Sequence, residues 1–224
     1  MSDAVPTDPP PRAARGPEPA RAGDEIVFGP LPVGALGRRS AGWWGAMTLI
    51  LTEAVLFGYL LFSYAFLALH PGGGWDGVEP PSFRLSGPNT ALLLASSGVV
   101  HLGGRALRRG RPRRAAGWLA LGAAMGAAFL GVQGLEWAEK PFSLDTHAYG
   151  SLYFVITGFH GAHVLAGLLM LIPAALWCRL GRVDGRRDAP VAVATAYWHF
   201  VDAVWVAVFA TLYVSPHLLA GGGP

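Results

Sequence analysis

Five long apolar runs alternate with short polar segments along this chain. The runs extend over Gly42–Leu69, Asn89–Leu107, Ala115–Trp137, Tyr149–Trp177 and Val191–Val214. Each is close to or longer than the roughly 20 residues that an α-helix needs to cross the hydrocarbon core of a bilayer. None shows the strict polar and apolar alternation of a membrane β-strand. The pattern therefore predicts an all-α, polytopic bundle of five transmembrane helices.

The two ends of the chain differ from this central region. Residues 1–40 are rich in proline and arginine and poor in large apolar side chains, so we expect a disordered cytoplasmic tail. Residues 41–217 carry the five spans, and residues 218–224 form a short C-terminal tail. Small residues such as Gly122 and Gly126 recur within the spans and allow helix backbones to approach closely. We therefore expect the five helices to pack together.

Basic residues are distributed unevenly among the loops. The chain has 17 lysines and arginines, and only Arg84 and Lys140 lie in the loops after the first and third spans. The others precede the first span or lie in the loops after the second and fourth spans, which predicts a cytoplasmic N-terminus and an external C-terminus. We expect a multi-pass protein of a bacterial inner membrane. The sequence pI of about 9.4 reflects these loops, so we expect no nucleic-acid partner.

One carboxyl group falls within the first span. Glu53 lies ten residues after Trp43, or about 15 Å along a helix, which places it near the bilayer midplane. An ionisable group at this depth costs free energy, so it is expected to have a hydrogen-bonding partner or a functional role. Two interpretations are open: a protonated carboxyl bonded to a neighbouring helix, and a group that exchanges protons or contacts a bound lipid.

Two further pairs of polar residues share helix faces in the fourth and fifth spans. His160 and His163 are three residues apart, as are His199 and Asp202. One interpretation is a buried polar network that fixes helix packing, with Asp202 neutralising a histidine of its own span or of the fourth span. The alternative is metal or haem ligation by the three histidines, which would make the protein a haem-binding membrane cytochrome.

The end of the third span carries Gln133 and Glu136, which we interpret as a polar cluster at the helix end. A small transporter with Glu53 as proton relay would be expected to show repeats or broken helices, which the sequence lacks. It also lacks a CxxC pair, an HExxH helix and a glycine-rich phosphate loop. The single cysteine, Cys178, excludes an intramolecular disulfide. We therefore expect no catalytic centre in this chain.

Three segments resemble subunit III of cytochrome c oxidase. Residues 131–171 contain TGFHGAHV and residues 196–214 contain YWHFVDAVW, and these two motifs are the most specific. Residues 43–67 resemble the family's helix with a membrane-buried glutamate. The resemblance extends in order over roughly residues 42–215, about three-quarters of the chain.

This resemblance implies a non-catalytic subunit of a proton-pumping haem-copper terminal oxidase that carries electrons from cytochrome c to oxygen. Similar subunits bind no haem or copper, because those cofactors lie in subunits I and II. They pack against subunit I in a V-shaped arrangement of helices with phospholipids in the cleft, and they support proton uptake.

The resemblance also implies roles for individual residues. Glu53 matches the glutamate that faces the cleft, and His163 lies near the lipid region. Arg179, at the end of the fourth span, is expected to contact a lipid headgroup. His199 and Asp202 match the motif on the last helix. All of these roles are structural or lipid-related.

The helix number departs from the mitochondrial pattern of seven. The first pair of helices is missing, and the proline-rich tail stands in its place. Five helices also occur in subunit III of quinol oxidases and in homologues associated with nitric oxide reductase, which are therefore alternatives. The TGFHG motif favours the cytochrome c oxidase type.

Overall fold

The computed structural model describes residues 41–70, 82–184 and 188–220, so the predicted tail of residues 1–40 lies outside the described residues. The described chain is helical, with elements α1 (Ala41–Leu69), α2 (Phe83–Arg108), α3 (Pro112–Ala138), α4 (Ala148–Arg179), α5 (Ala189–Phe209), the π-helical turn η1 (Ala210–Val214) and α6 (Ser215–Ala220). Five spans in the described residues are long and apolar enough to cross a membrane, the last of them running from α5 through η1 into α6. The prediction of five transmembrane helices is confirmed.

One helix boundary differs clearly from the prediction. α2 begins at Phe83 and not at Asn89, because the Ser82 hydroxyl accepts a hydrogen bond of 3.2 Å from the backbone N–H of Arg84 and caps the helix. Pro88 lies inside the helix, slightly more than one turn later, where its missing N–H costs a single hydrogen bond. The second span therefore begins earlier than the predicted Asn89.

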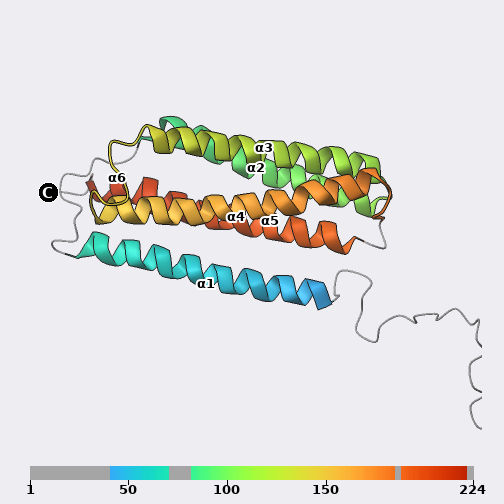
Figure 1. The fold of residues 1–224 in the computed structure, drawn as a ribbon, viewed down its shortest axis with the longest axis horizontal. Coiled ribbons are helices and arrows are strands. Elements are labelled where there is room, and N and C mark those ends of the chain that lie inside the picture. The colour runs from blue at the N-terminus through green and yellow to red at the C-terminus, as the bar shows by residue number, and fades with distance from the viewer. Residues whose placement is uncertain (1–40, 71–81, 185–187, 221–224) are drawn as a thin grey trace, which may run out of the picture. The chain divides into compact units, whose positions relative to one another are not determined.

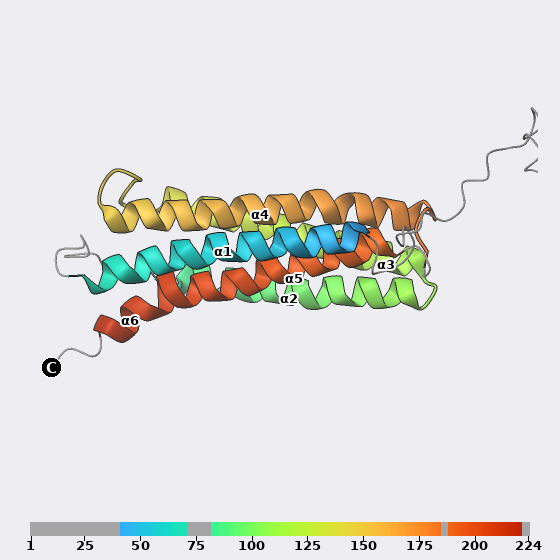
Figure 2. The ribbon, with the colours of Figure 1, turned by 90° about the horizontal axis from the view of Figure 1, so that it is seen from below.

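Four of the long helices form a closed bundle, and α1 lies against one side of it. α2 packs on α3, α3 on α4, α4 on α5, and α5 on α2, while α1 contacts α4 and α5. Figures 1 and 2 show these helices running side by side along their length. In Figure 1, α1 and α4 diverge toward the Ala41 end of α1. A cavity of about 460 Å³ at that end is lined by Gly42 of α1 and otherwise by residues of α4 and α5, among them Met170, Pro173 and Val193.

The closest packing in the bundle surrounds Trp198 of α5. A Cβ atom placed on Gly167 of α4 would lie 2.7 Å from the Trp198 ring, and one on Gly126 of α3 would overlap with the other edge of that ring. The indole N–H donates a hydrogen bond of 3.0 Å to the Ser96 hydroxyl of α2. Four helices therefore meet at this tryptophan, and the two glycines provide the space, as the small residues of the sequence predict.

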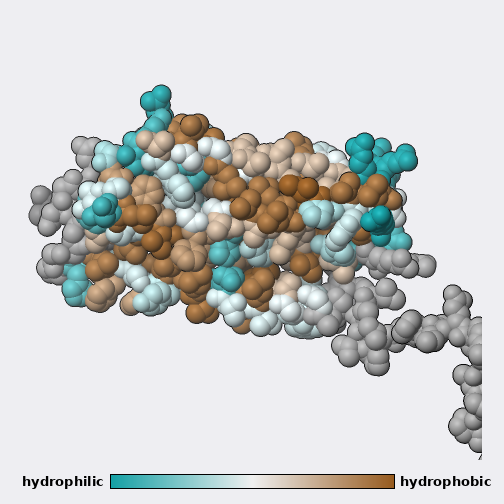
Figure 3. All heavy atoms as spheres, in the orientation of Figure 1, coloured by the Kyte–Doolittle hydropathy of each residue, from teal (hydrophilic) through white to brown (hydrophobic). Residues whose placement is uncertain are grey.

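The distribution of apolar and hydrophilic side chains on the surface is typical of a membrane protein. Figure 3 shows an apolar surface along the middle of the bundle and hydrophilic side chains toward its ends. At one end lie the turns between α2 and α3 and between α4 and α5, where the described arginines Arg105, Arg108, Arg109, Arg111, Arg113, Arg114, Arg179 and Arg182 are located. The chain is a multi-pass membrane protein.

The connection between α3 and α4, at the opposite end, is held by local hydrogen bonds. The Ser143 hydroxyl donates a bond of 2.5 Å to Asp145, which lowers the pKa of that exposed carboxyl. Nδ1 of His147 accepts a bond of 2.8 Å from the backbone N–H of Gly150 and caps α4. Because these bonds fix the start of α4, they also fix the height of its polar side chains within the membrane.

Candidate functional site at membrane depth

A carboxyl group and an imidazole meet between α1 and α4. Nε2 of His163 lies 3.0 Å from Oε2 of Glu53, and Nδ1 of the same ring lies 2.7 Å from the backbone carbonyl oxygen of Phe159. The Phe57 ring packs edge-on against the imidazole at a centroid distance of 5.0 Å. Both polar side chains remain partly exposed, and Figure 3 shows a small hydrophilic patch over α1 and α4 near mid-length. The partner that sequence reasoning required for Glu53 is His163.

The hydrogen bonds of His163 determine how many protons this pair holds. A carbonyl oxygen only accepts, so Nδ1 must carry a hydrogen to bond with Phe159. The contact between Nε2 and Oε2 then needs one further proton, which belongs either to the Glu53 carboxyl or to the imidazole. The pair has no net charge in either case. It is therefore a neutral unit in which one proton is shared between two helices.

A second polar group lies between α2 and α5. The Ser97 hydroxyl is 2.5 Å from Nδ1 of His199, and the ring of His101 lies 6.0 Å from the His199 ring. His101 is exposed, and Ser97 and His199 are half-buried. We call Ser97, His101 and His199 the α2–α5 polar face. Because these groups lie within the membrane-spanning parts of their helices, the face requires a partner that can form hydrogen bonds.

Asp202 does not pair with a histidine, so this expectation was wrong. The imidazole of His199 turns to the Ser97 hydroxyl of α2, which leaves the carboxyl of Asp202 one turn away on its own helix. That carboxyl is buried near Ser97, and neither of its oxygens has hydrogen-bond geometry with a described group. The residue contributes a buried polar group to the interface of α2 and α5.

The three histidines of the cofactor alternative do not converge. His163 faces α1 and His199 faces α2, whereas His160 is buried inside the bundle against the Trp205 ring, with centroids 4.7 Å apart. Neither nitrogen of His160 has a partner among the described residues. Within the same residues, no group of three His, Cys, Asp or Glu side chains could hold one metal ion. The geometry favours separate roles for the three imidazoles.

The polar cluster predicted at the end of α3 is larger than the sequence indicated. Oε1 of Glu136 accepts hydrogen bonds from the hydroxyls of Tyr213, at 2.8 Å, and Tyr153, at 3.2 Å. Nζ of Lys140 lies 3.1 Å from the same oxygen. Gln133 is buried one turn away, and its amide atoms have no partner among the described residues. The two tyrosines were missed because their positions near helix ends do not reveal which carboxyl they face.

The π-helical turn explains why Tyr213 reaches this cluster. Tyr213 lies inside η1, a turn type that is rare and occurs mostly as a single turn within an α-helix, frequently at functional sites. Its hydroxyl contacts both Glu136 and, at 3.0 Å, the hydroxyl of Tyr153. The turn therefore adjusts the end of the last span so that α3, α4 and η1 are joined by one carboxylate.

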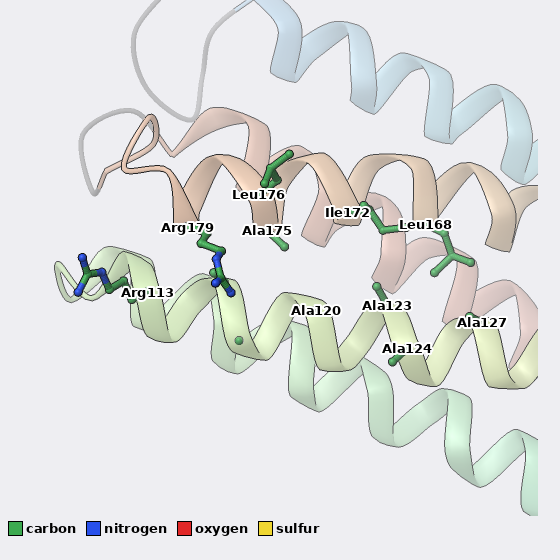
Figure 4. A pocket seen from close by; sticks show the side chains of 12 residues that line it. Arg113, Ala120, Ala123, Ala124, Ala127, Leu168, Ile172, Ala175, Leu176 and Arg179 are labelled. Atoms are coloured by element: carbon green, nitrogen blue, oxygen red, sulfur yellow. The ribbon is translucent and has the colours of Figure 1, made fainter.

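Arg179 lies apart from these groups. It is the last residue of α4 and is exposed. Its side chain lines a groove between α3 and α4 (Figure 4). It is not among the residues that line the cavity formed by Gly42 of α1 with α4 and α5. A headgroup contact of Arg179 would therefore be on the α3 side of α4.

Comparison with known proteins assigns the chain to a family. The sequence profile of "Cytochrome c oxidase subunit III" matches residues 39–216. A cytochrome c oxidase subunit 3 of Thermostichus vulcanus is 35% identical over 173 residues, which cover 76% of this chain and 85% of that protein. A probable cytochrome c oxidase subunit 3 of Nocardia farcinica is 32% identical over 174 residues, covering 75% and 85%. One from Danio rerio is 35% identical over 176 residues, covering 75% and 67%. The chain therefore belongs to the cytochrome c oxidase subunit III family.

Proposed function

We propose that this chain is the non-catalytic third subunit of a proton-pumping haem-copper oxidase that transfers electrons from cytochrome c to oxygen. The names of its relatives support cytochrome c as the electron donor. In this proposal, subunits I and II carry the haem and copper, and this chain stabilises subunit I. The separate positions of its own histidines are consistent with structural roles.

The observation that carries this proposal is the α2–α5 polar face. His101 is exposed and lies seven residues before Arg108 at the end of α2, or roughly 10 Å into the membrane. Imidazole and hydroxyl groups at this depth are poorly accommodated by hydrocarbon, whereas a neighbouring transmembrane helix can bond to them. We therefore assign this face to the contact with subunit I, with subunit II as a further partner in the complex.

The pair of Glu53 and His163 supports a role in proton uptake within the same proposal. It holds one shared proton and is partly exposed, so it is able to exchange a proton with groups outside the chain. A phospholipid would occupy the apolar cavity that Gly42 lines together with α4 and α5. The arginine-rich end of the bundle would face the cytoplasm of a bacterial inner membrane.

Site-specific photo-crosslinking tests this assignment. A benzophenone side chain introduced at His101, on the α2–α5 polar face, is expected to crosslink to subunit I in the native membrane. The matched control is Phe159 of α4, which is exposed within a span but lies away from this face. Crosslinks to subunit I from position 159 and none from position 101 would contradict the proposed contact.

Purification distinguishes the proposal from the cytochrome alternative. A tag on this chain is expected to retain subunits I and II together with the haem spectrum of the complex. After dissociation of the complex in detergent, the isolated chain is expected to lose that spectrum. A Soret band that remains with the isolated chain would overturn the proposed non-catalytic role.

A further inference from the structure

Four buried side chains inside the bundle carry polar atoms without a hydrogen-bond partner in the described part of the chain. These atoms are Oδ1 of Asn89, both amide atoms of Gln133, Oε2 of Glu136 and both ring nitrogens of His160. Each of the four residues is exposed by 4% or less, so bulk solvent does not reach them. An unpaired polar atom in such a place destabilises a fold, and buried polar groups of native proteins nearly always have a partner. The six atoms therefore require one.

Three of these side chains lie at successive levels between α3 and α4, which run side by side in opposite directions (Figure 1). Phe129 of α3 packs on His160 of α4, with ring centroids 5.8 Å apart. Two turns further along α3, Glu136 accepts a hydrogen bond of 3.2 Å from Tyr153 of α4. Gln133 lies between Phe129 and Glu136 on the buried face of α3. Its amide therefore falls between the levels of His160 and Tyr153, which are about 10 Å apart along α4.

Asn89 reaches the same region from α2. Its Nδ2 donates a hydrogen bond of 3.2 Å to the backbone carbonyl oxygen of Phe129. In an α-helix that carbonyl also accepts the backbone N–H four residues later, which here belongs to Gln133. The unpaired Oδ1 of Asn89 therefore lies close to the level of the Gln133 side chain. Three helices contribute unpaired polar atoms to one short stretch of the interior.

The unpaired atoms cannot satisfy one another. Oδ1 of Asn89, Oε1 of Gln133 and Oε2 of the Glu136 carboxylate only accept, whereas Nε2 of Gln133 donates. His160 adds one donor and one acceptor as a neutral imidazole, the form that avoids a buried cation without a counterion. Four acceptors thus face two donors, so re-pairing of these side chains leaves acceptors unpaired. A water molecule supplies two hydrogens, and a buried water typically makes about three hydrogen bonds to such groups.

The two ends of this stretch differ in their access to solvent. At one end, Glu136 pairs with Lys140 at 3.1 Å, and the lysine side chain retains an exposed fraction of 13%. At the other end, aromatic rings enclose His160. The ring centroid of Trp205 lies 4.7 Å from that of the imidazole, and Phe129 packs edge-on against it. Water can therefore enter beside Lys140, and the rings close the stretch beyond His160.

We propose that the bundle binds a short file of internal water molecules between Glu136 and His160. These waters bond to polar atoms of α2, α3 and α4 and exchange with solvent beside Lys140. They supply the hydrogens that the surplus acceptors need, and they join three helices at a level where the protein's own side chains do not meet. The site lies wholly within this chain, so it does not rest on the proposed function.

Radiolytic labelling in water enriched in the heavy oxygen isotope tests the file in the intact complex. A short X-ray pulse converts bound water into hydroxyl radicals, which modify neighbouring side chains even where bulk solvent does not reach. Trp205, which packs on His160, is expected to be modified and to take up the heavy isotope. Trp198 is the matched control, because it is also a fully buried indole of α5 but packs against Gly126 and Gly167. It is expected to stay unmodified.

Variants distinguish bound water from a dry polar interior. Gln133→Leu removes the amide in the middle of the file, and His160→Phe removes both ring nitrogens while keeping an aromatic ring. Both variants are expected to reduce the modification of Trp205 to the level of Trp198. Gln133→Leu is also expected to lower the thermal midpoint, because the waters lose bonding partners. Leu135→Ala, at an exposed position of α3, is the control and should leave the modification of Trp205 unchanged.

Three outcomes would overturn the water site. The first is modification of Trp205 that does not exceed that of Trp198 in the unaltered chain. The second is modification of Trp205 that persists in both Gln133→Leu and His160→Phe. The third is a higher thermal midpoint for Gln133→Leu, because replacing an amide by an apolar side chain stabilises a fold only where the amide was unpaired.

Discussion

Nε2 of His163 on α4 and Oε2 of Glu53 on α1 are 3.0 Å apart, and this contact joins the outlying helix to the bundle through one shared proton. We expect Glu53→Gln to preserve assembly, because the glutamine amide can donate to Nε2 in the same geometry. Glu53→Leu should destabilise the docking of α1 by about 1–2 kcal/mol, since it leaves Nε2 unpaired. Complex yield and thermal unfolding compare the stability of the two variants. Loss of the complex in Glu53→Gln would contradict the expected preservation of assembly.

Turnover of the Glu53→Gln variant tests the proposed role in proton uptake. A glutamine amide would hold the hydrogen bond to His163 but could not exchange the proton, so we expect slower proton uptake during sustained turnover while assembly stays normal. Proton uptake of reconstituted oxidase, followed with a pH-sensitive dye, provides the measurement. Wild-type rates in Glu53→Gln would restrict the pair to a structural role.

Ser97 should contribute to the packing of α2 on α5. We expect Ser97→Ala to destabilise the complex by about 1 kcal/mol, because His199 loses the hydroxyl at 2.5 Å. Ser63→Ala is the matched control, since the Ser63 hydroxyl bonds only to the Tyr59 carbonyl of its own helix in the described structure. Thermal unfolding midpoints in one detergent compare the two variants. Equal midpoints would show that this hydroxyl is dispensable.

The hydroxyl of Tyr213 should stabilise the last span. We expect Tyr213→Phe to cost about 1.5–3 kcal/mol, the range for a hydrogen bond to a charged group, because Glu136 loses its shortest bond. Tyr59→Phe removes the same atom from an exposed position of α1 and should have little effect. Calorimetry of the purified complex, or proteolysis of the segment after Phe209, would detect the change. Unchanged stability of the Tyr213→Phe variant would contradict a stabilising role of the hydrogen bonds to Glu136.

The space beside Trp198 should not tolerate a methyl group. We expect Gly167→Ala to destabilise the bundle by about 1–3 kcal/mol, because its Cβ would lie 2.7 Å from the indole ring. Gly134→Ala has nothing within 4 Å of the new atom and should be neutral or slightly stabilising, as alanine favours the helix. Expression level and thermal midpoint distinguish the two. Similar behaviour of both variants would indicate that Trp198 moves aside freely.

Hydropathy predicted the five spans because transmembrane helices obey one dominant constraint, the exclusion of polar surface from hydrocarbon. It also placed Glu53 at a depth that requires a partner. It could not identify His163 as that partner, because the choice depends on how α1 lies against α4. Spacing along one helix was misleading for His199 and Asp202, since a hydroxyl on another helix, Ser97, lies closer to the imidazole.

The positions at the end of the chain were hardest to predict. Tyr213 bonds to Glu136 from within η1, which departs from regular α-helical geometry, and no local sequence signal marks that departure. The groove that Arg179 lines could not be predicted either, because it is formed by alanines of α3. Hydropathy identifies these alanines only as part of a membrane span. Both features depend on the relative rotation of two helices, which is a property of the assembled bundle.

The number of residues in the π-helical turn determines the directions of the side chains at the end of the last span. A π turn accommodates one residue more than an α turn, and each residue of an α-helix rotates the side-chain direction by about 100°. Deleting a single residue between Phe209 and Tyr213 would restore a regular helix, while the residues beyond it would keep their present directions. An insertion that lengthens this segment further would instead rotate the side chains of all residues that follow it.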